Sequence, residues 1–249
     1  AIKKYLGVDR RTPNDFIYGE TNRYPMFINS AVNCIRYWIR LLQMEQLRLP
    51  YKAYRMLYDL DAKGKANWVS NVRVCLYENG FGDVWLNQGV GNVNIFIKVF
   101  RQRLIDCRWQ NWNHHINTSE RFNLYRTFCN SHDLKQYLQT EMNRQLKYVT
   151  AKFRLGISDL NVHHLRYRLY NDVELLCPLC KMSKENEVHF VLCCQRLNDL
   201  RVKFIQLKYY RQPCLFKLSL LMSSTNCDVI HNFSLFLYKA FQLRETITS

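Results

Sequence analysis

Glycine, proline and long apolar runs are scarce in this sequence, and each shortage excludes a class of structure. The 249 residues include eight glycines and five prolines, too few turn-forming residues for a β protein with many short strands. A membrane-spanning helix needs about 18 or more consecutive apolar residues, whereas the apolar stretch 214–222 is shorter and contains Lys217. We therefore expect a mainly α-helical chain that has no membrane partner.

Acidic residues are also few. The chain has 20 Asp and Glu against 36 Lys and Arg, which gives a formal net charge of +16. A surface with this excess of positive charge attracts phosphate backbones, so RNA and DNA are the expected partners. No nucleophile with a neighbouring base and no set of carboxylates stands out. We expect that the chain itself is not an enzyme.

Six of the ten cysteines are scattered singly, unlike the dense cysteines of a disulfide-stabilised secreted domain. We interpret them as small apolar side chains in a reducing, intracellular compartment, the nucleus and cytoplasm. They are Cys34, Cys75, Cys107, Cys129, Cys214 and Cys227. Residues 1–15 lack the apolar core and cleavage site of a signal peptide, and we expect the chain to be a portion of a longer protein.

Hydrophobic residues recur every three or four positions between Pro25 and Pro50, which predicts an amphipathic helix that Pro50 ends. Ile28, Val32 and Ile35 begin its apolar stripe. Further helices are expected at about 51–60, 67–79, 96–108 and 131–149, separated by polar or glycine-containing turns.

The predicted helix at 96–108 carries Lys98, Arg101 and Arg108 beside its apolar side. Guanidinium groups bind phosphate in a bidentate manner, and the aromatic rings of Trp109 and Trp112, which follow at helical spacing, can stack on bases. The alternative is a hydrophobic core stripe with a solvated basic face. Both interpretations remain open for this helix.

A second basic segment covers residues 151–170. Its cations Lys152, Arg154, Arg166 and Arg168 are opposed only by Asp159. The segment lies directly before the most cysteine-rich part of the chain. We predict that these four residues contact nucleic acid, mainly through its phosphates.

The cysteine-rich segment is CPLCKMSKENEVHFVLCC, residues 177–194. Cys177, Cys180, His189 and Cys194 follow the pattern Cys-x2-Cys-x8-His-x4-Cys, a set of ligands suited to tetrahedral Zn²⁺. In a regular helix Cys193 rather than Cys194 would share a face with His189. The spacing of zinc knuckles favours Cys194, and Cys193 is the alternative fourth ligand.

Four protein ligands close the coordination sphere of zinc, whereas a catalytic zinc keeps one position open for water. The His-x-Glu and Pro-Cys-x-x-Cys signatures of the zinc deaminases do not occur. We therefore predict a structural zinc. The alternative is a pair of reduced, buried cysteines with a hydrogen-bonded histidine.

The segment CPLCKMSKENEVHFVLCCQRLNDLR, residues 177–201, resembles the zinc-binding segment downstream of the reverse transcriptase in non-LTR retrotransposon polyproteins. Four other segments also resemble these retrotransposon polyproteins: YLGVDRRTPNDFIYGETNRYP at 5–25, CIRYWIRLL at 34–42, NGFG at 79–82 and FLYKAFQLRE at 236–245. The chain departs from the family pattern at Gln195, where proline is usual, and at the additional Cys193.

The resemblance implies four regions: a thumb-like helical region at 1–60, a helical linker at 61–150, a basic zinc-binding module at 151–211 and a helical tail at 212–249. The chain has no Asp-Asp pair to hold catalytic Mg²⁺, so the resemblance places the polymerase palm before Ala1, as a partner of this region. The implied function is non-catalytic binding of template RNA and target DNA during target-primed reverse transcription. The alternative is a zinc-stapled helical domain for protein interaction, without a nucleic-acid role.

Overall fold

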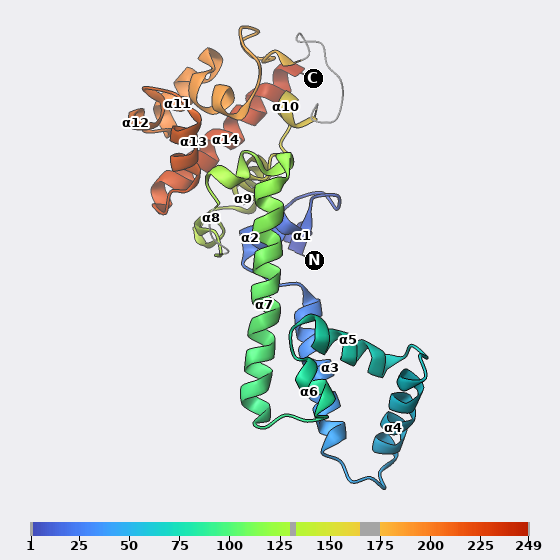
Figure 1. Cartoon of the computed structure of the whole chain (residues 1–249). Helices are drawn as coiled ribbons and strands as arrows, with labels where there is room; N and C mark the ends of the chain where they lie inside the picture. Colours follow the sequence, from blue (N-terminus) through green and yellow to red (C-terminus); the bar gives the residue numbers. More distant parts are fainter. Residues whose placement is uncertain (1, 130–132, 165–174, 249) are drawn as a thin grey trace. The chain divides into compact units, whose positions relative to one another are not determined.

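The computed structural model describes residues 2–129, 133–164 and 175–248. These residues are mainly α-helical, as Figure 1 shows, and their strand-like pairing is an isolated bridge between Leu176 and Lys184. The prediction of a mainly α fold is therefore confirmed. No helix in the described part of the chain combines the length and apolarity needed to cross a lipid bilayer.

The chain forms two compact units, one made of Tyr24–Asn113 and the other of Ala1–Arg23 together with His114–Ser249. The region boundaries expected after residues 60 and 150 fall inside helices α4 (Leu49–Ala62) and α9 (Arg144–Arg154). Tertiary packing thus divides the chain differently from its sequence motifs.

The unit of residues 24–113 contains α3 (Met26–Leu42), α4, α5 (Trp68–Glu78), α6 (Gly82–Leu86) and most of α7 (Val93–Thr118). The predicted stripe of α3 is buried, and Trp38 joins it in contact with Trp85, with ring centroids 5.9 Å apart. Helix α3 ends at Leu42, and Pro50 lies in the first turn of α4 instead of ending the earlier helix. Proline suits a first turn because that turn needs no N–H donor there.

Helix α5 of the same unit begins at a clear sequence signal. The side chain of Asn67 accepts a hydrogen bond from the Val69 N–H at 2.8 Å, and the Ser70 hydroxyl accepts one from the Asn67 N–H at 3.0 Å. This reciprocal capping satisfies N–H groups that a helix start otherwise leaves unpaired.

The other unit contains α1 (Ile2–Tyr5), α2 (Asn14–Thr21), the end of α7, α8 (Gln136–Gln139), α9, α10 (Asn161–His164), α11 (Asn198–Phe204), α12 (Leu207–Tyr210), α13 (Leu215–Met222) and α14 (Cys227–Thr248). Single-turn 3₁₀ helices η1 (Glu120–Phe122), η2 (Tyr125–Thr127) and η5 (Gln195–Leu197) and the π-helix η4 (His189–Cys193) lie between them. Helices α9 and α14 pack along each other, with the Thr150 hydroxyl donating to that of Ser234 at 2.7 Å.

The amino-terminal segment is an integral part of this unit. Phe16 of α2 packs against Phe122, with ring centroids 4.2 Å apart. Gly7 adopts a φ of +66°, and a Cβ there would lie 2.3 Å from the ring of Tyr148 on α9. Glycine is therefore required at this close approach.

Candidate metal centre

The four side chains predicted as metal ligands lie together. The ligand atoms of Cys177, Cys180, His189 and Cys194 are all within 4.8 Å of one another. The Sγ atoms of Cys177 and Cys194 are 3.9 Å apart, and the Sγ of Cys180 is 3.3 Å from Nε2 of His189. A tetrahedral ion with metal–sulfur bonds of about 2.3 Å holds its thiolates about 3.8 Å apart. These residues thus form a Cys₃His cluster that can hold a metal ion.

The first two ligands come from a tight turn. The N–H of Lys181 donates to the carbonyl of Cys177 at 2.8 Å, and the N–H of Cys177 donates to the carbonyl of Ser183 at 2.8 Å. Lys181 closes the turn in the left-handed region with a φ of 55°. Pro178 restricts the backbone between the two cysteines by fixing its own φ. Both thiols therefore face the same side of the turn.

The other two ligands lie at the two ends of the π-helix η4, with His189 as its first residue and Cys194 directly after its last. The N–H of Cys194 donates to the carbonyl of His189 at 2.7 Å, a bond across five residues instead of four. This wider turn brings Cys194 to the face of His189 that Cys193 would occupy in a regular α-helix. Cys194 is buried, whereas Cys193 is exposed and lies outside the cluster.

Arg201 of α11 supports the turn that carries these ligands. Its Nε donates to the carbonyl of Val191 at 2.8 Å, and its Nη2 donates to the carbonyl of Cys194 at 2.7 Å. The residue is buried, and this burial lowers the pKa of Arg201 from its ordinary value. Arg201 thus donates to the carbonyl of Val191 at the irregular end of the helix and adds a second donor to the carbonyl of Cys194, which also accepts the Leu197 N–H at 3.2 Å.

The thiols of Cys177 and Cys194 are linked by a hydrogen bond. This bond raises the pKa of Cys177 to about 12, with a further contribution from burial, and it lowers the pKa of Cys194. A metal ion replaces the proton between such sulfurs because thiolates are the binding species.

Two carboxylates between the ligands connect the cluster to the rest of the unit. Glu185 is buried and accepts bonds from Arg244 of α14 at 2.8 and 3.0 Å and from the N–H of Asn161 at 2.7 Å. Oε1 of Glu187 lies 2.8 Å from Nε2 of His163 on α10. The segment that carries the Cys₃His cluster is therefore held against both α10 and α14.

Glu185, Glu187 and Arg201 are supporting residues that were not predicted from the sequence. The sequence held a signal for the two glutamates, because acidic residues between cysteine and histidine ligands in a basic chain are expected to pair with cations. The partners of the two glutamates lie on α10 and α14, far from them in the sequence, so residue spacing alone does not identify these partners.

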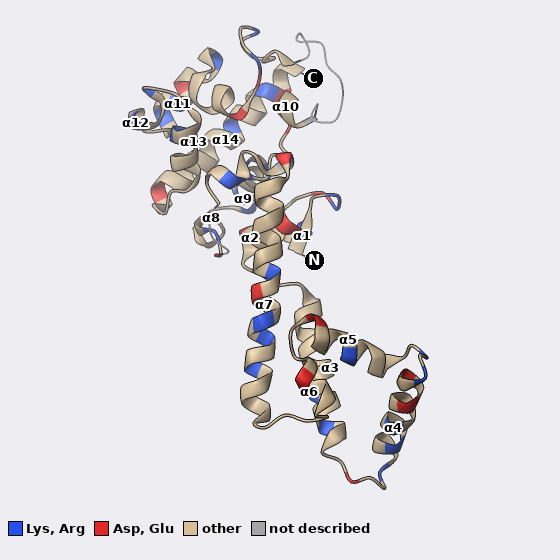
Figure 2. Ribbon diagram, viewed as in Figure 1, with Lys and Arg blue, Asp and Glu red and all other residues tan. Residues whose placement is uncertain are grey.

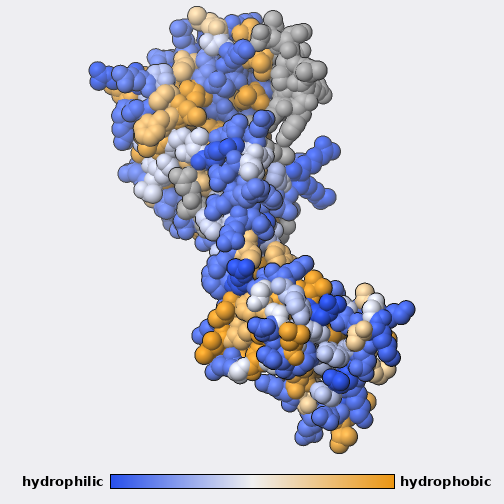
Figure 3. Space-filling view, in the orientation of Figure 1, coloured by the Kyte–Doolittle hydropathy of each residue, from blue (hydrophilic) through white to orange (hydrophobic). Residues whose placement is uncertain are grey.

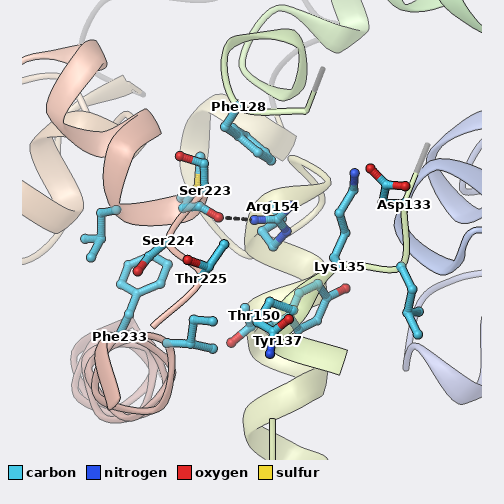
Figure 4. Close-up of a pocket in the computed structure, with 15 residues that line it drawn as sticks. Phe128, Asp133, Lys135, Tyr137, Thr150, Arg154, Ser223, Ser224, Thr225 and Phe233 are labelled. Atoms are coloured by element: carbon cyan, nitrogen blue, oxygen red, sulfur yellow. Dashed lines mark hydrogen bonds between the residues drawn. The ribbon is translucent and has the colours of Figure 1, made fainter. Parts of the chain in front are cut away.

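Arg154 corrects a prediction, because it is buried and is not available to phosphate. Its Nε and Nη2 donate to both carboxylate oxygens of Glu20 at 2.9 and 3.1 Å, and its Nη1 donates to the carbonyl of Met222. Figure 4 shows the guanidinium between the rings of Phe128 and Tyr137, whose centroids are 4.6 and 5.2 Å from Cζ. Burial opposes the charge, but attraction to Glu20 outweighs it and raises the pKa of Arg154.

The other predicted nucleic-acid contacts lie in different places. Lys152 is half-buried on α9, while Arg166 and Arg168 lie outside the described residues. Lys98 and Arg101 are exposed on α7, and Arg108 is half-buried on the same helix. The basic residues along α7 can be followed in Figure 2.

Comparison of the chain with protein-family models, with curated proteins and with solved structures found no match.

Proposed function

We propose that the Cys₃His cluster holds a structural Zn²⁺. Three thiolates and one imidazole are soft and borderline ligands that suit zinc better than magnesium or calcium. Four protein ligands complete a tetrahedral site and leave no position for a reacting water. The ion would join the Cys177–Cys180 turn to η4, and its binding energy would contribute to the folding of this part of the chain.

We further propose that the chain is a non-catalytic nucleic-acid-binding region of a retrotransposon reverse transcriptase, which holds template RNA and target DNA during target-primed synthesis. The observation that carries this proposal is a closed Cys₃His cluster in a chain with a formal net charge of +16. Exposed Lys98 and Arg101 on α7 provide part of the positive surface. The resemblance to the retrotransposon family adds the specific biological setting.

The direct test measures zinc content and RNA binding on the same preparation. We expect one equivalent of zinc and an RNA affinity that falls steeply with salt, because each phosphate contact to a single strand contributes about 0.7 to the logarithmic slope. An affinity that does not change with salt contradicts the nucleic-acid role. The retrotransposon setting is tested separately by the coding sequence before Ala1, which should encode a polymerase palm with paired carboxylates.

The second candidate is a zinc-stapled helical domain for protein interaction. It is favoured by large apolar side chains exposed on the unit of residues 24–113, including Met26 at 83%, Leu47 at 82% and Leu49 at 80% exposure. Figure 3 shows hydrophobic residues on the side of this unit that faces the viewer. This candidate predicts partner binding that is indifferent to salt and is lost when these side chains become polar.

A further inference from the structure

A group of exposed cations follows the metal cluster directly in the chain. Arg196 lies on η5, Lys203 on α11, Lys208 on α12 and Arg211 just beyond α12, and we call these four residues the α11–α12 surface. Between residues 196 and 211 the only acidic residue is Asp199. None of the four cations forms an ion pair with another described residue. Figure 2 shows basic residues around both helices.

Each of the two helices ends in an aromatic residue beside a positive charge: Phe204 lies beside Lys203 of the α11–α12 surface, and Tyr210 lies beside the buried Arg201, which is not one of the four. The Nζ of Lys203 is 5.6 Å from the ring centroid of Phe204, and the Cζ of Arg201 is 5.9 Å from that of Tyr210. Phe204 and Tyr210 are partly exposed. Unpaired bases stack on such rings, whereas the faces of paired bases are covered within a duplex.

The α11–α12 surface is held in a fixed position relative to the Cys₃His cluster. Helices α11 and α12 both pack against η4, the element that provides His189. Arg201 ties α11 to the carbonyls of Val191 and Cys194. The segment with the four ligands therefore fixes the positions of these cations and rings relative to one another. A flexible basic segment would not hold its cations in fixed positions.

We propose that the α11–α12 surface binds a single-stranded segment of nucleic acid, with its four cations on phosphates and with Phe204 and Tyr210 on unpaired bases. This inference rests on the proposed nucleic-acid function and names the surface and the form of ligand. None of the four cations was among the contacts predicted from the sequence.

The test compares two quadruple variants of the whole chain. One changes Arg196, Lys203, Lys208 and Arg211 to Gln. The control changes four exposed cations of the other unit to Gln, with the same loss of net charge: Arg48, Lys52, Lys63 and Lys65. The dissociation constant for a labelled oligouridine is measured over a range of salt concentrations. We expect the first variant to reduce the salt slope by about three units and the control to leave it nearly unchanged.

A third variant, Tyr210→Leu, tests stacking without changing charge. We expect it to weaken oligouridine binding about tenfold or more and to leave duplex RNA binding unchanged. Zinc content and helical circular dichroism check that each variant is folded. If the first quadruple variant does not fold, the double variant Lys203→Gln with Arg211→Gln replaces it, with half the expected change in slope.

The outcomes separate this inference from the proposed function. If the wild-type chain binds RNA with a steep salt slope and both quadruple variants behave alike, the α11–α12 surface is wrong and the proposed function stands. If duplex RNA loses as much affinity as oligouridine in Tyr210→Leu, the single-stranded assignment is overturned. If the zinc-loaded wild-type chain binds no RNA, both proposals fail.

Discussion

The two units of the chain are stabilised by different kinds of interaction. In the unit of residues 24–113, consecutive helices share a hydrophobic core, and the ion pair between Arg73 and Asp61 is open to solvent on one side, with the Arg73 side chain 41% and the Asp61 side chain 8% exposed. In the other unit, buried carboxylates pair with arginines far away in the sequence: Glu20 with Arg154, 134 residues apart, and Glu185 with Arg244, 59 residues apart. The first unit depends on a local apolar pattern, whereas the second depends on buried charges and contains the Cys₃His cluster.

The largest effect is expected when Cys177→Ser removes one of the four residues of the Cys₃His cluster. Zinc in small modules contributes an apparent binding free energy of about 10 kcal/mol or more, which is comparable to the whole stability of a typical domain, about 5–15 kcal/mol. We expect loss of zinc and rapid proteolysis of the segment that carries the ligands and α11. The unit of residues 24–113 should keep its protease resistance.

The matched control for this experiment is Cys193→Ser, because Cys193 is exposed and adjacent to the fourth ligand. It should retain full zinc content and wild-type proteolysis. Full zinc content in Cys177→Ser would show that the four side chains do not act as a ligand set.

The second largest effect should come from the buried pair that joins α2 to α9. Arg154→Met leaves the Glu20 carboxylate buried without its partner, which costs about 3–5 kcal/mol. Urea unfolding followed by fluorescence should show the unit that contains α9 unfolding at lower denaturant. The double variant Glu20→Leu with Arg154→Met should recover most of this loss, since it removes both charges. A single variant as stable as the wild type would exclude a stabilising role for the pair.

The same contrast explains what the sequence could predict. The apolar stripe of α3 was predicted because helical periodicity is a local property, and its members Ile28, Val32 and Ile35 are buried as expected. The Cys₃His cluster was predicted because the spacing of its four residues is likewise a local property of the sequence. Burial of Arg154 could not be predicted, since it depends on Glu20, which lies 134 residues earlier in the chain.

Irregular backbone limited the predictions in two places. The choice between Cys193 and Cys194 depends on the π-helical bond from Cys194 to His189, which spacing does not specify. The helix expected at 131–149 is instead divided between α8 and α9, with extended backbone at Thr140 and Asn143. Asn143 was an available signal, because its side chain caps α9 by accepting the Leu146 N–H at 2.9 Å.

An intermediate effect is expected when the support of the metal-binding turn is removed by Arg201→Met. The buried carbonyl of Val191 loses its donor, at a cost of about 1–3 kcal/mol, whereas the carbonyl of Cys194 keeps the Leu197 N–H. Zinc should still bind, because all four ligands remain, but chelators should remove it faster than from the wild-type chain. Arg196→Met is the control, since Arg196 is exposed and has no such bonds. Equal rates of zinc loss in both variants would contradict the supporting role of Arg201.

The smallest effect is expected at the surface pair of the other unit. Hydrogen bonds from Arg73 lower the pKa of Asp61, so the folded state holds this proton less tightly than the unfolded state. The contribution to stability is complete above the unfolded pKa of about 3.9 and is lost as the pH falls through the lower pKa of the folded state. Because Arg73 is well exposed, solvent screening limits the contribution to about 0.5 kcal/mol or less. The free energy of unfolding of the unit of residues 24–113 at pH 7 should therefore change little in Arg73→Gln, and the small difference should vanish in strong acid.

A loss of unfolding free energy comparable to that of Arg154→Met would show that this unit also depends on specific charges. The contrast between the two units would then fail.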